Sequence, residues 1–278
     1  MKRNQVLQLL KSSRLVFLMT AAVCVAVVGC AGKQKPAPDD YSGQARYAYE
    51  EGVEAYEASE YIEALKRLNF VRTKFPYSKY AALATLRVAD TYFAQESMPD
   101  AIEAYRRFVQ LYPTHPDVPY AQYRVGLCYY DQLPGDWFFM PPAYEKDLAS
   151  TEQAELALKK FLELHPNSQY ADDTREKLDI VRDRLAEHEF YVASFYLKRN
   201  QPRAAASRFQ TLRTRFPGGS FEQRSMFLMG KCFLLLKDVP KAVSIWEELI
   251  VKYPNHPLSA AASEYIRDHR LSGATHPG

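Results

Sequence analysis

The stretch AASRFQTLRTRFP at residues 205–217 begins with an alanine and ends with a proline twelve positions later. The same spacing occurs five times along the chain, at Ala64/Pro76, Ala101/Pro113, Ala154/Pro166, Ala205/Pro217 and Ala242/Pro254. Five matches in order are typical of a protein built from structural repeats. An array of repeats presents an extended surface, so the pattern favours a binding scaffold.

Each unit reads as two helices, and the pattern is similar to that of tetratricopeptide repeats. The second helix carries the alanine followed four residues later by a large side chain, and the first helix carries a small residue, at Gly52, Ala89, Gly126, Ala193 and Gly230. The small residue lets the helices approach, the large one fills the gap, and the proline closes the second helix. We therefore predict an all-α, tetratricopeptide-like superhelical solenoid of five helix pairs.

One departure from the period lies in the third unit, where 28 residues separate Gly126 from Ala154 instead of 12. The excess predicts an inserted loop at 133–148. This loop contains four large apolar residues, Trp137, Phe138, Phe139 and Met140. They form either a partner-binding patch, since aromatic residues are enriched at interfaces, or a cover folded back on the solenoid.

A second departure separates the front of the chain from the rear. Pro166 and Ala193 lie 27 residues apart where 13 would suffice, and the 14 extra residues correspond to about four helical turns. A long helix over TREKLDIVRDRLAEHEFYVASFYLKR is therefore expected to join front repeats 1–3, at 44–173, to rear repeats 4–5, within 174–271. The small, polar segment 272–278 is expected to be disordered.

The first 29 residues have the layout of a secretory signal peptide. Four basic residues, Lys2, Arg3, Lys11 and Arg14, precede an apolar run from Leu15 to Val28. The run is shorter than the roughly 20 residues that a membrane-spanning helix requires. Removal of this segment would change the formal net charge from +3 to −1, which argues against a nucleic-acid partner.

The end of this segment, Val27-Val28-Gly29-Cys30, resembles the bacterial lipobox. The resemblance implies that Cys30 carries N-palmitoyl and S-diacylglycerol groups, and that Ala31 permits sorting to the outer membrane. Several acyl chains suffice for stable anchoring, so we expect the protein on the periplasmic face of that membrane. Residues 30–43 are expected to be a lipidated, flexible linker.

The remaining cysteines, Cys128 and Cys232, allow a disulfide in an oxidising compartment. However, they belong to units three and five, and repeats contact only their neighbours. We therefore favour two buried, unpaired thiols.

The sequence offers no catalytic motif: it has no Ser/His/Asp elbow, glycine-rich phosphate loop, HExxH or CxxC. His115 and His256 occupy equivalent turns, YPTHP and YPNHP, and are interpreted as turn residues. His188 and its two glutamate neighbours point in different directions on a helix and cannot share one ion. We expect no enzyme activity, no metal and no cofactor other than the lipid.

Two segments, HPNSQYADD at 165–173 and RLAEHEFYVASFYLKRNQPRAAASRFQ at 184–210, resemble the BamD family of outer-membrane assembly lipoproteins. The likeness extends over most of the chain after Cys30. It implies membership of the BAM complex together with its other lipoproteins, docking of the rear repeats on the POTRA domains of BamA, and binding of unfolded outer-membrane β-barrel proteins by the front repeats. Arg208 matches the family's BamA-contacting arginine, and Arg213 and Arg215 lie nearby.

The front repeats carry a candidate substrate groove on their first helices. Helical spacing from the small residues predicts an aromatic surface with two arginines in equivalent slots: Tyr49, Tyr56, Arg87, Phe93, Tyr123, Arg124 and Tyr130. Such a surface suits a peptide strand with alternating apolar side chains, and the arginines suit its terminal carboxylate. The alternative is that the tyrosines pack between repeats and the arginines are solvated.

Two other functions share the lipobox and the repeats. A tetratricopeptide lipoprotein can serve as a pilotin that targets secretin subunits, or as a regulator of peptidoglycan synthesis. Neither accounts for the 184–210 segment or for the long helix between the two groups of repeats.

Overall fold

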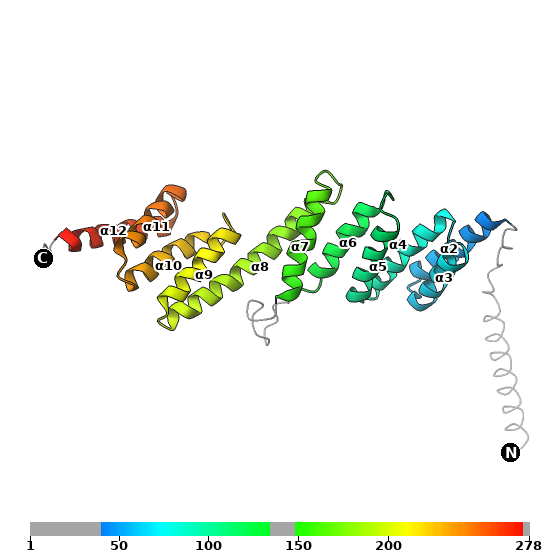
Figure 1. Ribbon diagram of the computed structural model, residues 1–278, viewed down its shortest axis with the longest axis horizontal. Helices are drawn as coiled ribbons and strands as arrows, with labels where there is room; N and C mark the ends of the chain where they lie inside the picture. The colour runs from blue at the N-terminus through cyan, green and yellow to red at the C-terminus, as the bar shows by residue number, and fades with distance from the viewer. Residues whose placement is uncertain (1–39, 134–147, 275–278) are drawn as a thin grey trace, which may run out of the picture. The chain divides into compact units, whose positions relative to one another are not determined.

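The computed structural model describes residues 40–133 and 148–274, and these residues form eleven α-helices (Figure 1). Residues 1–47 and 48–278 make up two separate units, with the division inside the first helix. The expected signal peptide, the lipid site at Cys30, most of the linker and the four apolar residues at 137–140 lie outside the described residues.

Ten of the described helices form the five predicted pairs. The first helices of the pairs are α2 (Tyr41–Glu57), α4 (Lys79–Ala94), α6 (Val118–Tyr130), α8 (Ala171–Lys198) and α10 (Glu222–Leu235). The second helices are α3 (Tyr61–Lys74), α5 (Met98–Leu111), α7 (Ala149–Leu164), α9 (Pro202–Arg215) and α11 (Val239–Lys252). From α3 to α12 each helix packs against the next along the chain, which is the arrangement of a tetratricopeptide-like solenoid.

The helices of a pair approach closely at the small residue of the first helix. A Cβ added to Gly52 would lie 2.9 Å from Leu68, and one added to Gly126 would lie 2.6 Å from Leu158. A Cβ added to Gly230 would collide with the Trp246 ring. Ala89 and Ala193 hold the corresponding places in the other units, fully buried in the clusters that contain Tyr105 and Phe209. The predicted match of small against large side chains is therefore present in every pair.

The long helix is confirmed as α8, whose 28 residues are continuous. It packs against α7 and α9, and one hydrophobic cluster contains residues from all three helices, including Leu158, Leu185 and Leu212. The front and rear repeats consequently share a core across α8.

Both ends of the folded region extend beyond the predicted boundaries. Helix α2 begins at Tyr41, within the segment expected to be a linker, and the Asp40 carboxylate accepts a hydrogen bond from the Gly43 amide at 2.9 Å, as a helix cap does. At the other end an eleventh helix, α12 (Pro257–Ala274), packs against α10 and α11 and buries Ala262 and Ile266 near Trp246. This helix covers the last repeat and continues three residues into the expected tail.

Cys128 and Cys232 are buried and unpaired, as favoured from their positions in the repeats. Burial raises the pKa of the Cys128 thiol to about 12 and that of Cys232 to about 11, so both remain protonated at neutral pH. Within the described part of the chain, no helix has both the length and the apolarity required to cross a membrane.

The close approach in the fifth pair predicts the effect of adding one methyl group at Gly230. Replacing an interior helical glycine with alanine ordinarily stabilises a helix by about 1 kcal/mol. Here the new Cβ would meet the buried Trp246 ring, which is held by a hydrogen bond from Nε1 to the Phe227 carbonyl at 3.1 Å. We expect Gly230→Ala to reduce the free energy of unfolding by about 1–3 kcal/mol, measured by urea denaturation.

Gly126→Ala is the matched control, because its closest neighbour is a terminal methyl group of Leu158 that can rotate away. Its cost should be smaller than that of Gly230→Ala. Equal or higher stability of Gly230→Ala relative to the unmodified protein would contradict this account of the packing.

Candidate functional site

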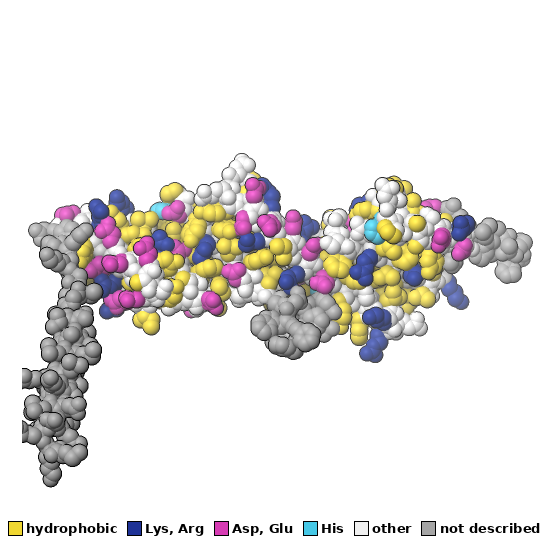
Figure 2. All heavy atoms as spheres, turned by 180° about the vertical axis from the view of Figure 1, so that it is seen from behind, with side chains coloured by type: hydrophobic (Ala, Val, Ile, Leu, Met, Phe, Trp, Pro, Cys, Tyr) yellow, Lys and Arg dark blue, Asp and Glu magenta, His cyan; other side chains and the backbone are white. Residues whose placement is uncertain are grey.

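Hydrophobic side chains reach the surface over both the front and the rear repeats, among basic and acidic ones, on the face seen in Figure 2. Scattered exposure of this kind is normal and does not identify a site. The informative observation is a connected set of polar and aromatic contacts. All seven predicted groove residues belong to such contacts on the first helices α2, α4 and α6: Tyr49, Tyr56, Arg87, Phe93, Tyr123, Arg124 and Tyr130.

The centre of these contacts is Asp90 of α4, whose side chain is buried although it carries a carboxylate. Its Oδ1 accepts hydrogen bonds from the hydroxyls of Tyr105 at 2.6 Å and Tyr120 at 2.9 Å, and its Oδ2 accepts one from Arg87 Nη1 at 3.1 Å. Burial, together with the adjacent Asp90 charge, raises the pKa of both tyrosines well above its usual range. They therefore remain hydrogen-bond donors to the carboxylate.

The two arginines occupy equivalent slots but have different surroundings. Arg87 is bound to Asp90 and lies over the Tyr56 ring, 5.2 Å from its centroid. Arg124 donates from Nε to the Tyr105 hydroxyl at 3.0 Å, and its guanidinium lies 3.7 Å from the centroid of the Phe93 ring. Among residues 40–133 and 148–274, the terminal nitrogens of Arg124 have no hydrogen-bond acceptor. Arg124 is thus positioned by its neighbours yet retains donors for a ligand.

A second set of contacts continues from α6 to α8. Tyr123 stacks on Tyr170 with 4.7 Å between ring centroids, and its hydroxyl donates to Asp173 Oδ2 at 2.6 Å. Lys177 donates to Asp173 Oδ1 at 2.6 Å and lies 5.5 Å from the centroid of the Tyr130 ring. Burial acts to raise the pKa of Asp173, but the hydrogen bonds from Lys177 and Tyr123 outweigh it and lower the pKa. The carboxylate therefore remains charged near neutral pH.

We define the front surface as the seven predicted residues, and the residues that support it by direct contacts are Asp90, Tyr105, Tyr120, Tyr170, Asp173 and Lys177. The second group was missed from the sequence. Asp90 sits in the helical stretch RVADTYF, where a single acidic residue resembles a solvated charge, and only the burial of its side chain reveals its role. Aromatic rings with fixed cations beside them suit an apolar peptide that also carries a carboxylate.

The three rear arginines on α9 have three different surroundings. The side chain of Arg208 is 46% exposed, and its Nη1 lies 3.4 Å from Oε2 of the buried Glu189. Arg215 lies near two buried carboxylates, with Nη2 3.7 Å from Glu155 Oε2 and Nη1 3.9 Å from Glu189 Oε1. Two of the three arginines therefore rest on carboxylates of α7 and α8 while remaining partly exposed.

Arg213 differs because its side chain is only 12% exposed and its Nη2 donates to Glu248 Oε1 of α11 at 2.5 Å. Its position between α9 and α11 gives it a structural contact inside the chain. It offers less surface to a partner than Arg208 or Arg215 does.

The turn after the fourth pair contains two adjacent glycines, Gly218 and Gly219, and the buried Glu222 holds it in place. Glu222 Oε2 accepts hydrogen bonds from the Gly218 amide at 2.6 Å and the Tyr253 hydroxyl at 2.5 Å, and Oε1 accepts one from Lys252 Nζ at 2.6 Å. Gly218 has a φ of 77°, which glycine adopts readily. Gly218 provides the backbone conformation that the turn requires. The Glu222 carboxylate links this turn to Lys252 and Tyr253 at the end of the fifth pair.

The predicted role of two histidines is confirmed. His115 Nδ1 accepts a hydrogen bond from the Asp117 amide at 3.2 Å, and His256 Nδ1 accepts one from the Leu258 amide at 3.1 Å. Each ring thus stabilises the turn in which it lies. Over the described residues, no group of three or more His, Cys, Asp or Glu side chains is placed to hold a metal ion.

The helix pairs define the class of this protein as a tetratricopeptide-like solenoid, and residues 224–256 match the tetratricopeptide repeat family. Residues 41–237 match the YfiO family, described as outer membrane lipoproteins, and the chain belongs to that family.

Named relatives of the chain are outer membrane protein assembly factors BamD. The relative from Caulobacter vibrioides is 28% identical over 263 residues, covering 94% of this chain and 84% of the relative. The relative from Xylella fastidiosa is 26% identical and covers 86% and 82% of the two chains, and that from Neisseria meningitidis serogroup A is 26% identical and covers 86% and 92%. The similarity spans both the front and the rear repeats.

The contacts of Glu222 predict how stability depends on pH. Burial acts to raise the pKa of Glu222, but hydrogen bonds from Lys252, Tyr253 and the Gly218 amide outweigh it and lower the pKa below 4.5. A carboxyl group whose pKa is lower in the folded state stabilises the fold above its ordinary pKa and loses that contribution as pH falls through the folded value.

We therefore expect Glu222→Gln to reduce the free energy of unfolding by about 1–3 kcal/mol at pH 7. Urea denaturation at pH 7, 5, 4 and 3 should show the difference from the unmodified protein shrinking below pH 4.5. A difference that stays constant down to pH 3 would show that the charge of Glu222 contributes nothing.

Proposed function

We propose that this protein is a non-catalytic, lipid-anchored assembly factor for outer-membrane β-barrel proteins. The observation that carries the proposal is the similarity to BamD assembly factors over most of the chain, together with the family match at 41–237. The lipid would be attached at Cys30 and would hold the repeats on the periplasmic face of the outer membrane.

The rear repeats are proposed to bind the POTRA domains of BamA through Arg208. Its side chain is nearly half exposed, and among residues 40–133 and 148–274 its one ion pair is the long contact with Glu189, which leaves other guanidinium nitrogens available for a carboxylate. Glu189 contacts both Arg208 and Arg215, and Glu155 contacts Arg215. These carboxylates hold the two arginine side chains close together. A guanidinium that is already positioned loses less conformational freedom when it forms an ion pair with a partner.

The front surface is proposed to bind the unfolded barrel protein. Strands of a β-barrel alternate apolar and polar side chains, so one face of an extended segment would lie on the aromatic rings. Arg124 is proposed to receive the terminal carboxylate, because its terminal nitrogens lack an acceptor among the described residues while Phe93 and Tyr105 fix its orientation. Arg87 is assigned a positioning role, since it is already bound to Asp90.

The rear contact is tested by co-purification from solubilised membranes. Arg208→Glu should reduce the recovery of BamA with the tagged protein by about tenfold, since a charge-assisted contact worth about 1.5 kcal/mol is replaced by repulsion. The matched control is Arg203→Glu, an exposed arginine of the same helix, which should leave BamA recovery unchanged. Recovery of a secretin or a wall synthase in place of BamA would reject the proposed function itself.

The front contact is tested with two peptides that share an alternating apolar sequence ending in phenylalanine, one with a free carboxylate and the other amidated. We expect the free-acid peptide to bind about tenfold more tightly to the unmodified protein, by fluorescence anisotropy. Arg124→Gln should abolish this preference, whereas Arg107→Gln, at an exposed arginine of α5, should preserve it. The readout is a ratio, so a general loss of stability does not imitate it. An equal affinity for both peptides in the unmodified protein would refute the carboxylate contact.

A further inference from the structure

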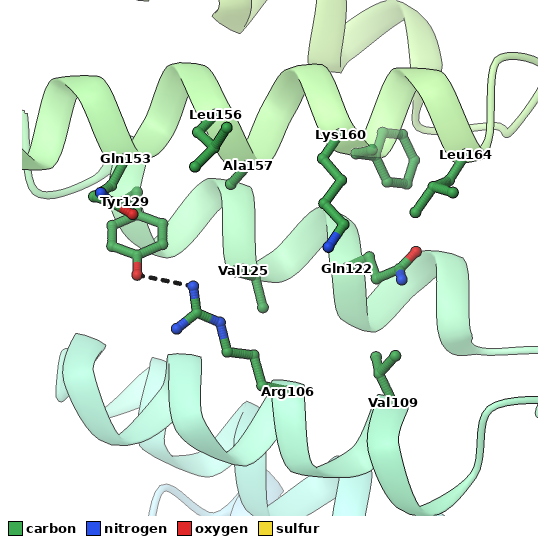
Figure 3. A pocket seen from close by; sticks show the side chains of 11 residues that line it. Arg106, Val109, Gln122, Val125, Tyr129, Gln153, Leu156, Ala157, Lys160 and Leu164 are labelled. Atoms are coloured by element: carbon green, nitrogen blue, oxygen red, sulfur yellow. Dashed lines mark hydrogen bonds between the residues drawn. The ribbon is translucent and has the colours of Figure 1, made fainter.

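A concave site lies between α5, α6 and α7 (Figure 3). Its volume is about 240 Å³, and none of the residues that define the front surface lines it. Arg106 extends from α5 and Lys160 from α7 toward the space between the two helices, with Val125 of α6 between them. We call this site the α5/α7 groove.

Two leucines of α7 line the groove and are exposed to solvent, Leu156 by 63% and Leu164 by 53%. Comparison with the other repeats shows that the fold does not require Leu156. The position two residues after the repeat alanine is polar in the four other units, at Lys66, Glu103, Ser207 and Ser244. An exposed apolar residue at the edge of a concave site, where the repeats otherwise carry polar ones, indicates binding.

The charged residues that line the groove are both basic. Arg106 Nη2 donates to the Tyr129 hydroxyl at 3.1 Å, which holds the guanidinium at the groove. The Lys160 ammonium has no acidic partner within residues 40–133 and 148–274. No aspartate or glutamate is among the described residues that line the groove. The groove therefore combines apolar contact area with an unneutralised positive charge.

We propose that the α5/α7 groove binds an extended segment of a partner protein in which an apolar side chain is flanked by carboxylates. The apolar side chain contacts Leu156 and Leu164, and the carboxylates pair with Arg106 and Lys160. A second copy of this chain is a poorer occupant, because a symmetric contact would place the same basic residues against each other.

The test uses an eight-residue peptide of alternating leucine and aspartate, labelled with fluorescein, together with a version in which lysine replaces every aspartate. Fluorescein is attached to the N-terminus of each peptide and the C-terminus is amidated, so neither chain presents a terminal carboxylate to the front surface. Fluorescence anisotropy with the purified full-length protein at low salt should show the acidic peptide binding at least about tenfold more tightly than the basic one.

Substitutions then locate the binding site. Leu156→Ser, which introduces the residue found at this position in units four and five, should weaken binding of the acidic peptide about tenfold. Lys160→Glu should remove the preference for the acidic peptide. The matched control Val251→Ser, at a residue that is 83% exposed outside the groove, should leave the affinity unchanged.

Equal binding of the two peptides by the unmodified protein would overturn the proposal, as would an acidic-peptide affinity that neither groove substitution alters. Sedimentation equilibrium checks the alternative occupant. A dimer that Leu156→Ser dissociates would assign the groove to a second copy of the chain and overturn the peptide assignment. The outcome does not depend on BamA binding, so it is independent of the proposed function.

Discussion

The fold depends on the close approach of two helices at one small residue in each repeat. At Gly230 there is no room for even a methyl group, because the Trp246 ring occupies that space. The large side chain is buried by its own pair and in turn supports the next helix, as Trp246 supports Tyr265 of α12. Packing of this kind fixes the distance between the helices of a pair and provides the surface on which the next pair packs.

Close packing also explains why a carboxylate can occupy the interior of the front repeats. Asp90 lies beside the small residue Ala89, where α4 packs against α5, and the hydroxyls of Tyr105 from α5 and Tyr120 from α6 both reach it. A buried charge is costly unless it is fully hydrogen-bonded, and here two hydroxyls and a guanidinium provide the bonds. The same contacts orient Arg124 and Phe93, so the polar interior and the exposed aromatic surface depend on each other.

The spacing of alanines and prolines predicted all five pairs because the small-to-large contact repeats at a fixed interval, and the length between Pro166 and Ala193 predicted α8. Other features had no periodic signal. Helix α12 lies outside the five alanine-to-proline matches, and the role of Asp90 depends on tyrosines 15 and 30 residues away. The restraint on the turn at Gly218 and Gly219 also has no local signal, because the Glu222 carboxylate that binds the turn is itself held by Lys252 and Tyr253, about 30 residues further on. The local sequence is sufficient to predict the helices. Polar contacts between residues far apart in the sequence can be identified only in the folded structure.

The unbroken α8 has a geometric consequence. Asp173, which holds Tyr123 and Lys177, and Glu189, which holds Arg208, stand on the same helix sixteen residues apart, or about 24 Å at 1.5 Å per residue. Helix α8 therefore sets the distance between Asp173, which supports the front surface, and Glu189, which contacts Arg208. One residue inserted between them would rotate Asp173 by about 100° around the helix axis relative to Glu189. Insertions and deletions within α8 are therefore restricted in evolution to lengths that come close to whole helical turns.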